Sequence, residues 1–380
     1  MNQTLFATQS KSAKALFLAV LAVGLLSLAW AAPADAKIKV GMVLPLTGPL
    51  AATGNDIANG SRAAIASDAA ASAAIELIIV DDQFDPVKSE QLARQLVTDQ
   101  KVDALLSCFG TVSCLAVSKV AQELSVPLIG AMAGAEVLRA ADRNMVYSVR
   151  GSATQEITSL LKYMDSIGKP ASSVVIQDDG FGKAYANSLV ALETQLGYQP
   201  IAKINLDPKA PNYVGIAKQA RAKGVEAIIL FANTTHSVGI IKALNDSKYY
   251  GQILNLAGQA NGGFVKGLSG GAQLAIFSTV TPSPFTANSV LTRGFHNAWK
   301  ASQKNESYSY INFEAYINAR VLIEAQKRGK ATSAASLDRA LGELNNFDMG
   351  GLVVGFSGKR RQGATFADTA VLLKSGRFKH

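Results

Sequence analysis

Histidine and cysteine are scarce in this chain, and their scarcity argues against several kinds of catalytic site. Three histidines and two cysteines occur among 380 residues, and the cysteines have no histidine near them in the sequence. The usual ligands of a zinc site are therefore missing. The sequence also lacks a P-loop, a HExxH helix and a GxSxG nucleophile elbow. We predict no metal, no cofactor and no catalytic residue.

Charged side chains are also few, at 17% of the residues against 48% that are hydrophobic. The formal net charge is +9, but the basic residues are scattered. Aromatic residues do not alternate with them as they do in a nucleic-acid-binding groove. We expect a basic solvated surface, large hydrophobic cores and no nucleic-acid partner.

The first 36 residues predict a cleaved export signal. Lys11 and Lys14 precede an uncharged apolar run over residues 15–30, and residues 34–36 have the small-x-small pattern of a cleavage site. The run is short for a membrane span and is soon followed by Pro33. No cysteine lies near the predicted cleavage site, so a lipid anchor is not supported. We expect the mature chain to be residues 37–380, in the periplasm.

Short apolar strands alternate with helices in two separate series along the mature chain. The first series opens with a strand over 37–44 and a predicted helix over 51–74. The second begins with a helix over 153–167 and a strand over 173–177. Such alternation predicts parallel sheets with helices on both faces. We therefore predict an α/β fold of two doubly wound parallel-sheet lobes, with one ligand cleft at the carboxyl ends of the strands.

The tail of the chain predicts a return to the first lobe and an end in the second, which makes the hinge multi-stranded. The predicted parts are residues 1–36 for the signal peptide, 37–149 and 281–350 for the first lobe, and 150–280 and 351–380 for the second lobe.

The stretch 104–120 is central to this prediction. It is typical of a strand, a turn of small and hydroxyl residues, and a helix whose first turn carries Thr111 and Ser113 after Gly110. Free N–H groups and the helix dipole can hold a carboxylate or a phosphate there. Cys108 and Cys114 flank the turn, and two interpretations stay open: a small disulfide, or two separate buried residues.

His236, in a polar turn after a predicted strand, is the histidine best placed for chemistry. A ligand contact or a solvated side chain is the preferred interpretation. An exported hydrolase with His236 as its base is the alternative from another class of protein.

Several short motifs occur in order along the mature chain: residues 46–50 (LTGPL), 81–86 (DDQFDP), 126–130 (VPLIG), 177–182 (QDDGFG) and 313–320 (FEAYINAR). Together they resemble the periplasmic solute-binding proteins of branched-chain amino-acid type ABC transporters, of the leucine/isoleucine/valine-binding-protein-like type I group. The resemblance implies two lobes joined by a three-strand hinge that close on one small organic solute. It also implies docking on membrane permease subunits, a monomeric state and no catalysis.

The resemblance also implies the position of the ligand. The expected ligand-binding residues are Thr53, Gly110, Thr111, Ser113, Ala133 and Gly134 in the first lobe, and Phe181, Asn233, Thr234, His236, Ala257 and Gln259 in the second.

This sequence departs from the family pattern at two places in that site. Gly134 stands where the family has a hydroxyl, and Ala257, or Gln259 if the loop is shifted, stands where the family has an acid. A buried ammonium without a carboxylate is costly. The sequence therefore favours a carboxylate-bearing solute without a free amine, such as an aromatic or aliphatic acid or an amide-like compound.

Two alternatives stay open. A branched-chain amino acid remains the runner-up, with Asp178, Asp179 or Glu314 supplying the missing negative charge. A sensor that presents its closed form to a regulatory partner is the other alternative.

Overall fold

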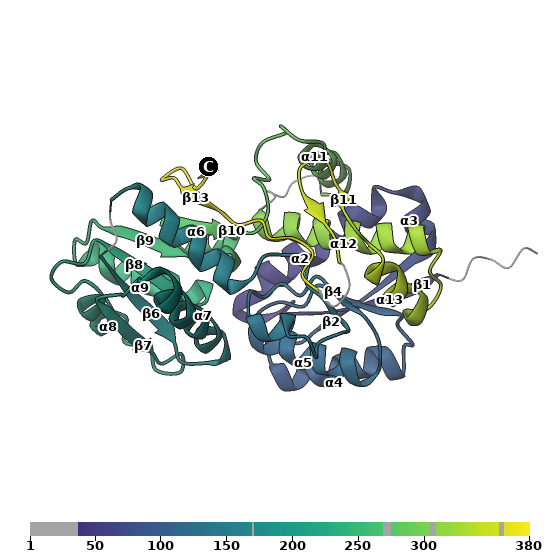
Figure 1. Ribbon diagram of the computed structural model, residues 1–380, viewed down its shortest axis with the longest axis horizontal. Coiled ribbons are helices and arrows are strands. Elements are labelled where there is room, and N and C mark those ends of the chain that lie inside the picture. The colour runs from purple at the N-terminus through teal and green to yellow at the C-terminus, as the bar shows by residue number, and fades with distance from the viewer. Residues whose placement is uncertain (1–36, 169–170, 269–274, 304–308, 357–360) are drawn as a thin grey trace, which may run out of the picture. The chain divides into compact units, whose positions relative to one another are not determined.

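The computed structural model describes residues 37–168, 171–268, 275–303, 309–356 and 361–380 (Figure 1). The predicted signal segment 1–36 lies outside these residues. Strands of the described chain form two large sheets and one small antiparallel pair, β11 (Phe347–Asp348) with β12 (Val353–Val354). In the described ranges, no helix combines the length and apolarity needed to cross a membrane.

The first sheet consists of five parallel strands in the order β2-β1-β3-β4-β5. These strands are β1 (Ile38–Leu44), β2 (Ile75–Asp81), β3 (Ala104–Leu106), β4 (Leu128–Ile129) and β5 (Val146–Tyr147). Side chains of a strand point alternately to the two faces. In β1, accordingly, Val40 and Met42 belong to one hydrophobic core and Val43 to the other.

Helices cover both faces of this sheet. One core contains side chains of α2 (Ala51–Ala66), α11 (Val290–Ser302), α12 (Tyr310–Gly329) and α13 (Ala334–Gly342); the opposite core contains those of α4 (Pro86–Thr98) and α5 (Thr111–Glu123). The short helices η2 (Gly48–Leu50), α3 (Ala69–Ala74) and η3 (Glu136–Arg139) complete this part. The predicted single helix over 51–74 is wrong, because the Asp68 carboxylate accepts the N–H of Ala71 and starts a separate helix.

The second sheet has seven strands in the order β14-β13-β10-β9-β8-β6-β7. They are β6 (Ser172–Gln177), β7 (Ala202–Leu206), β8 (Ala227–Phe231), β9 (Gln252–Asn255), β10 (Ala275–Thr279), β13 (Asp368–Leu372) and β14 (Phe378–Lys379). The prediction of two doubly wound α/β lobes is confirmed. The sheet is mixed rather than purely parallel, because β13 runs antiparallel to β10 and to β14.

Both faces of the second sheet are also covered. One face packs on α6 (Ala153–Ser166) and α7 (Gly180–Leu196), and the other on α8 (Tyr213–Ala220), α9 (Thr234–Asp246) and α10 (Gly262–Gly267). The short helix η4 (Ala257–Gln259) follows β9. Ile228 and Leu230 of β8 enter one core, whereas Ile229 and Phe231 enter the other. Burial of both faces explains the uninterrupted apolar sequence of β8.

Three stretches of chain connect the two sheets: β5 to α6, β10 to α11, and β12 to β13, the last of which includes residues 357–360 outside the described ranges. The first and third lie side by side, since the N–H of Ala364 donates to the carbonyl of Val149. Leu352, Val354 and Phe356 pack in the core of the first sheet, although they follow the predicted lobe boundary at residue 350. We therefore propose that the second lobe resumes near β13 instead.

The alternation in β8 makes a stability prediction. Leu230→Ala leaves a cavity in a fully buried strand and should lower the free energy of unfolding by about 2–5 kcal/mol. Leu196→Ala, at a side chain that is 54% exposed at the end of α7, is the matched control and should change little. Urea unfolding measures both; equal effects would contradict the burial of Leu230 in the core.

Candidate functional site

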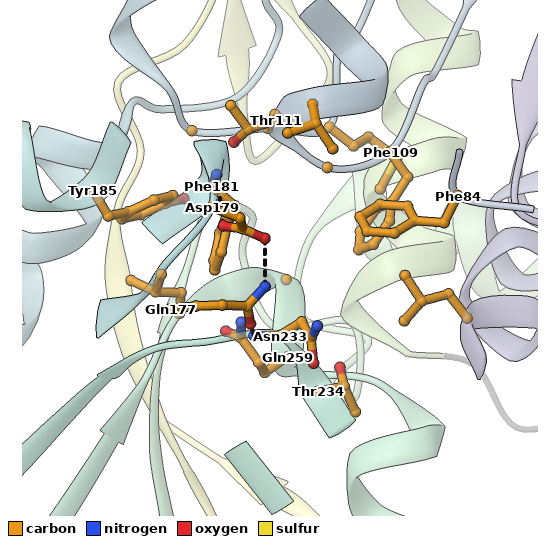
Figure 2. Close-up of a pocket in the computed structure, with 18 of the residues that line it drawn as sticks. Phe84, Phe109, Thr111, Gln177, Asp179, Phe181, Tyr185, Asn233, Thr234 and Gln259 are labelled. Carbon is orange, nitrogen blue, oxygen red and sulfur yellow. Dashed lines mark hydrogen bonds between the residues drawn. The ribbon is translucent and has the colours of Figure 1, made fainter. Parts of the chain in front are cut away.

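A pocket that is partly open to solvent is lined by residues of loops and helices that follow strands of both sheets (Figure 2). Leu50 and residues 109–112 follow β1 and β3 of the first sheet, and Asp179 and Asn233 follow β6 and β8 of the second. In each sheet the strand order reverses direction between those two strands. The crevice outside such a switch point is where open α/β sheets bind ligands. The topology therefore brings two switch points to one pocket.

The turn before α5 forms one wall of the pocket. Gly110 has φ +77°, and a Cβ atom there would lie 2.7 Å from the ring of Phe84, so glycine is needed for both conformation and space. Thr111 is the first residue of α5, is 1% exposed, and its Oγ1 has no hydrogen-bond partner. A helix N-terminus and an unpartnered hydroxyl thus meet in the pocket.

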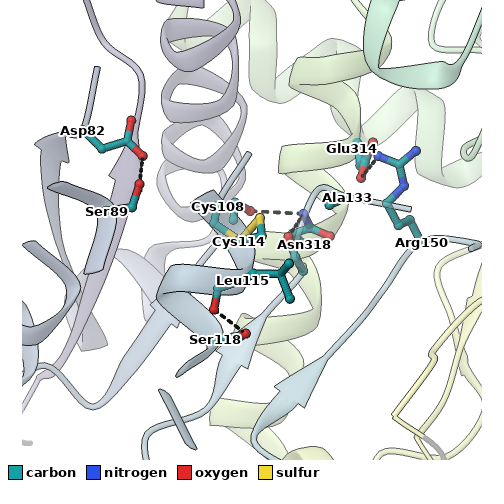
Figure 3. The surroundings of a disulfide bond; sticks show 12 residues. Asp82, Ser89, Cys108, Cys114, Leu115, Ser118, Ala133, Arg150, Glu314 and Asn318 are labelled. Atoms are coloured by element: carbon teal, nitrogen blue, oxygen red, sulfur yellow. Dashed lines mark hydrogen bonds and ion pairs between the residues drawn. A yellow bond between two sulfur atoms is a disulfide. The ribbon is translucent and has the colours of Figure 1, made fainter. Parts of the chain in front are cut away.

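Cys108 and Cys114 are joined by a disulfide, which decides between the two interpretations of the sequence (Figure 3). Both cysteines are buried. The residues between them include Phe109, Gly110 and Thr111, which line the pocket. The bond therefore closes a small ring around the predicted anion-binding turn.

Aromatic rings form much of the remaining wall. Phe84 and Phe109 lie 6.4 Å apart between ring centroids, and Phe181 and Tyr185 lie 5.1 Å apart. Figure 2 shows the first pair on one side of the pocket and the second pair on the other. Flat apolar surface on two sides suits a ring or a branched aliphatic group.

Asp82 holds Phe84 in its position. Phe84 has a left-handed backbone with φ +62°, and its N–H donates to Asp82 Oδ1 over 2.9 Å. The hydroxyl of Ser89 donates to Asp82 Oδ2 over 2.7 Å (Figure 3). Burial raises the pKa of the Asp82 carboxyl, although these hydrogen bonds oppose the rise.

Asp179 is the acidic side chain that reaches the pocket from the second sheet. Its Oδ1 accepts the N–H groups of Phe181 and Gly182 at 2.9 and 3.0 Å, which caps α7. Its Oδ2 accepts Gln177 Nε2 at 2.5 Å. Gln177 Oε1 in turn accepts the N–H of Asn233. Most of the acceptor capacity of Asp179 is thus used by its own chain.

Gln259 is the last residue of η4, and one of the two polar atoms of its side-chain amide has a hydrogen-bond partner. Its Nε2 donates to the carbonyl of Ala232, whereas its Oε1 has no hydrogen-bond partner. The side chain is 3% exposed and lines the pocket.

A buried ion-pair network borders the pocket at Arg150. This residue is 4% exposed; its Nη2 donates to Glu156 Oε1 over 2.6 Å, and its Nη1 lies 3.5 Å from Glu314 Oε1. Burial alone would lower the pKa of Arg150, but the charges of Glu314 and Glu156 raise it overall. Burial raises the pKa of Glu314, although Arg150 opposes the rise. The Nε of Arg150 has no hydrogen-bond partner.

Glu156 is the centre of this network. Besides Arg150, it accepts the hydroxyl of Tyr185 (2.7 Å), the N–H of Ala257 (2.9 Å) and the hydroxyl of Ser278 (2.8 Å). Its side chain is fully buried. One carboxylate therefore ties together α6, α7, η4 and β10.

The structure brings most of the sequence-predicted residues together. Those that line the pocket are Gly110, Thr111, Ala133, Gly134, Phe181, Asn233, Thr234 and Gln259. The structure places the others outside the lining: Thr53 is buried in α2, Ser113 is buried in α5, the Ala257 N–H donates to Glu156, and His236 contacts Tyr213. Ligand binding by any of them stays a prediction.

The glycine at position 134 has a structural reason. A Cβ atom there would collide with the Tyr185 hydroxyl and would lie 2.8 Å from Glu156 Oε1. The Tyr185 hydroxyl, from α7, therefore excludes any side chain at position 134, including the hydroxyl that the family resemblance implies there.

Sequence reasoning missed several residues that line the pocket: Leu50, Phe84, Phe109, Val112, Met132, Arg150, Gln177, Tyr185 and Leu256. It considered Asp179 only as a substitute charge. An available signal was the position of Gln177 at the end of a predicted strand. Arg150 gave a weaker signal, as a charge beside a predicted crossing strand.

His236 does not line the pocket. The ring Nδ1 of His236 lies 2.9 Å from the Tyr213 hydroxyl, and the backbone N–H of His236 donates to Asn233 Oδ1. Burial lowers the pKa of the His236 side chain. Among the described residues, no group of three or more His, Cys, Asp or Glu side chains is placed to hold a metal ion.

The chain belongs to the periplasmic binding protein family, whose sequence model matches residues 37–373. Membership makes it a solute-binding protein of a periplasmic type rather than a member of an enzyme family.

Comparisons with individual proteins agree with this family. The chain is 24% identical to Leu/Ile/Val-binding protein homolog 7 of Brucella suis over 337 residues, which are 84% of each protein. It is 26% identical to homolog 6 of the same organism over 240 residues, which are 60% of each.

Solved structures share the fold. A possible leucine/isoleucine/valine-binding protein from Rhodopirellula baltica superposes with a TM-score of 0.82 at 20% identity, covering 92% of this chain and 98% of that one. The leucine-binding protein LivK of Thermotoga maritima gives 0.76 at 18% identity, covering 90% and 97%.

The Arg150 network makes a second stability prediction. Glu156→Gln keeps the shape but removes the closest charge that neutralises Arg150, so the free energy of unfolding should fall by about 3–5 kcal/mol. Asp178→Asn, which breaks the exposed pair with Lys183, is the control and should leave the unfolding midpoint almost unchanged. Urea unfolding of both variants is the measurement, and an unaltered midpoint for Glu156→Gln would show that the network does not stabilise the fold.

Proposed function

We propose that this protein is the substrate-binding component of an ABC uptake system and captures a small carboxylate-bearing solute in the pocket. It works as a monomer in the periplasm and delivers the solute to membrane permease subunits. The observation that carries the proposal is a set of buried hydrogen-bond donors in the pocket that have no partner in the protein: Thr111 Oγ1 and Arg150 Nε, beside the N-terminus of α5.

These donors fit a carboxylate. Buried polar groups are rarely left without a partner, because the loss of hydration is not compensated. An anion at the start of α5 would accept from the hydroxyl of Thr111 and the first N–H groups of the helix. Arg150 pairs with Glu156 through Nη2 and lies 3.5 Å from Glu314 through Nη1, so its Nε is the guanidinium nitrogen left without a partner.

The rest of the pocket favours an acid without a free amine. Of the described residues that line the pocket, Asp179 is the single acidic one, and three hydrogen bonds from its own chain already occupy its carboxylate. An ammonium would compete with the capping of α7. Phe84, Phe109 and Phe181 offer apolar surface for an aromatic or aliphatic group.

A branched-chain amino acid is the second candidate, and Asp179 is the observation that favours it. The names of the relatives point the same way. Calorimetric titration of the mature chain with benzoate, phenylacetate, 4-methylpentanoate, leucine and valine separates the two candidates. Micromolar binding of an acid without an amine supports the first, and binding of leucine or valine alone supports the second.

Thr111→Val tests the anion-binding turn. It keeps the shape but removes the unpartnered hydroxyl, so affinity for the carboxylate ligand should fall by about 3- to 10-fold, as expected for one hydrogen bond. Thr194→Val, on the exposed surface of α7, is the control and should bind as the unaltered chain does. Titration calorimetry gives both constants, and an unchanged affinity in Thr111→Val would place the carboxylate elsewhere.

A further inference from the structure

We infer that the ligand carries a neutral hydrogen-bond donor, a hydroxyl or an amide N–H, at the end away from its carboxylate, and that Gln259 recognises this group. The inference rests on the proposed function, because it assumes a carboxylate at the α5 turn. It narrows the solute class to hydroxylated or amide-bearing carboxylic acids, with hydroxybenzoates as the simplest examples.

The orientation of the Gln259 amide follows from its surroundings. Nε2 donates to the carbonyl of Ala232, an acceptor that requires the nitrogen on that side. Oε1 is then the atom left without a partner in a side chain that is 97% buried. A buried acceptor left unsatisfied costs about 1–3 kcal/mol, and a ligand donor would recover that cost on binding.

The backbone around Gln259 is held in place before any ligand arrives. The N–H of Ala257 donates to Glu156 at 2.9 Å. The amide of Asn261 donates to the hydroxyl of Thr234 and to the carbonyl of Gly258. The unpartnered oxygen of Gln259 is therefore preorganised rather than free to turn toward solvent.

Gln259 ends η4, which follows a strand of the second sheet, and Thr111 begins α5, which follows a strand of the first. The two residues lie at different sides of the pocket (Figure 2). Thr111 contributes to the anion site, so the group that meets Gln259 belongs to a separate part of the ligand. Phe84 and Phe109 form the wall between these two sides in the same view. A flat ring with a carboxylate at one end and a hydrogen-bond donor at the other would fit the anion site at Thr111, the wall of Phe84 and Phe109, and the Gln259 oxygen.

The donor is neutral because the group that accepts it is neutral. An amide oxygen has no formal charge to balance a desolvated ammonium, whereas it pairs fully with a hydroxyl or an amide N–H. A site built around such a hydrogen bond discriminates strongly against an analogue that lacks the donor, since the buried acceptor then stays unpaired.

The test is a titration of the mature chain with benzoate, 3-hydroxybenzoate, 4-hydroxybenzoate and leucine. We expect one hydroxybenzoate to bind at least about 10-fold more tightly than benzoate. In Gln259→Leu, that hydroxybenzoate should lose this advantage, whereas the affinity for benzoate should stay equal or rise.

Gln195→Leu, an exposed glutamine on α7, is the matched control and should keep the full preference. The comparison of benzoate with the hydroxybenzoates uses the unaltered chain, so the inference can still be tested if Gln259→Leu does not fold. Equal binding of benzoate and both hydroxybenzoates would overturn the inference and leave the proposed function intact. A preference retained in Gln259→Leu would also overturn it. Binding of leucine but of no acid would overturn both the inference and the proposed solute class.

Discussion

The ion pair between Arg150 and Glu156 is the interaction on which the arrangement of the pocket depends. Arg150 lies where the chain leaves the first sheet and Glu156 lies on α6, so their contact fixes the first crossing segment. Glu156 also accepts hydrogen bonds from Tyr185, Ala257 and Ser278, which lie on three other elements around the second sheet. A fully buried carboxylate is stable only when its hydrogen bonds are satisfied, so these elements are forced into one arrangement. The same network leaves the Nε of Arg150, a residue that lines the pocket, without a hydrogen-bond partner.

A helix begins on each side of the pocket, α5 beside the first sheet and α7 beside the second, and the two helix starts differ in how they are capped. Beside the first sheet, the disulfide between Cys108 and Cys114 encloses the start of α5, whose N-cap Gly110 provides no side-chain cap. On the second sheet, Asp179 uses its carboxylate to cap α7, so that helix start is already neutralised by the protein. This difference in capping is the basis for proposing that an anion binds beside the first sheet and a neutral group beside the second.

Much of the fold was predictable because it follows from local periodicity. Alternating strands and helices, with apolar runs such as β8, require parallel sheets covered on both faces. The candidate turns at Gly110, Gly134 and Asn233 were also predictable, since turns after parallel strands meet at the same edge of a sheet. The antiparallel β13 and β14 gave no such signal, because strand direction depends on a partner that is distant in the sequence.

The sequence by itself determined the two α/β lobes, the family, and most of the turns that line the pocket, because each depends on residues close together along the chain. Only the tertiary structure decided which side chains have partners. Glu156 meets Ala257 and Ser278 across more than a hundred residues, and the position of Tyr185 explains why Gly134 has no side chain. The bond between Cys108 and Cys114, open in the sequence, was likewise decided by geometry. Hydrogen-bond satisfaction is a property of packed neighbours, so the unpartnered atoms of Thr111 and Gln259 become visible only once both sheets are folded.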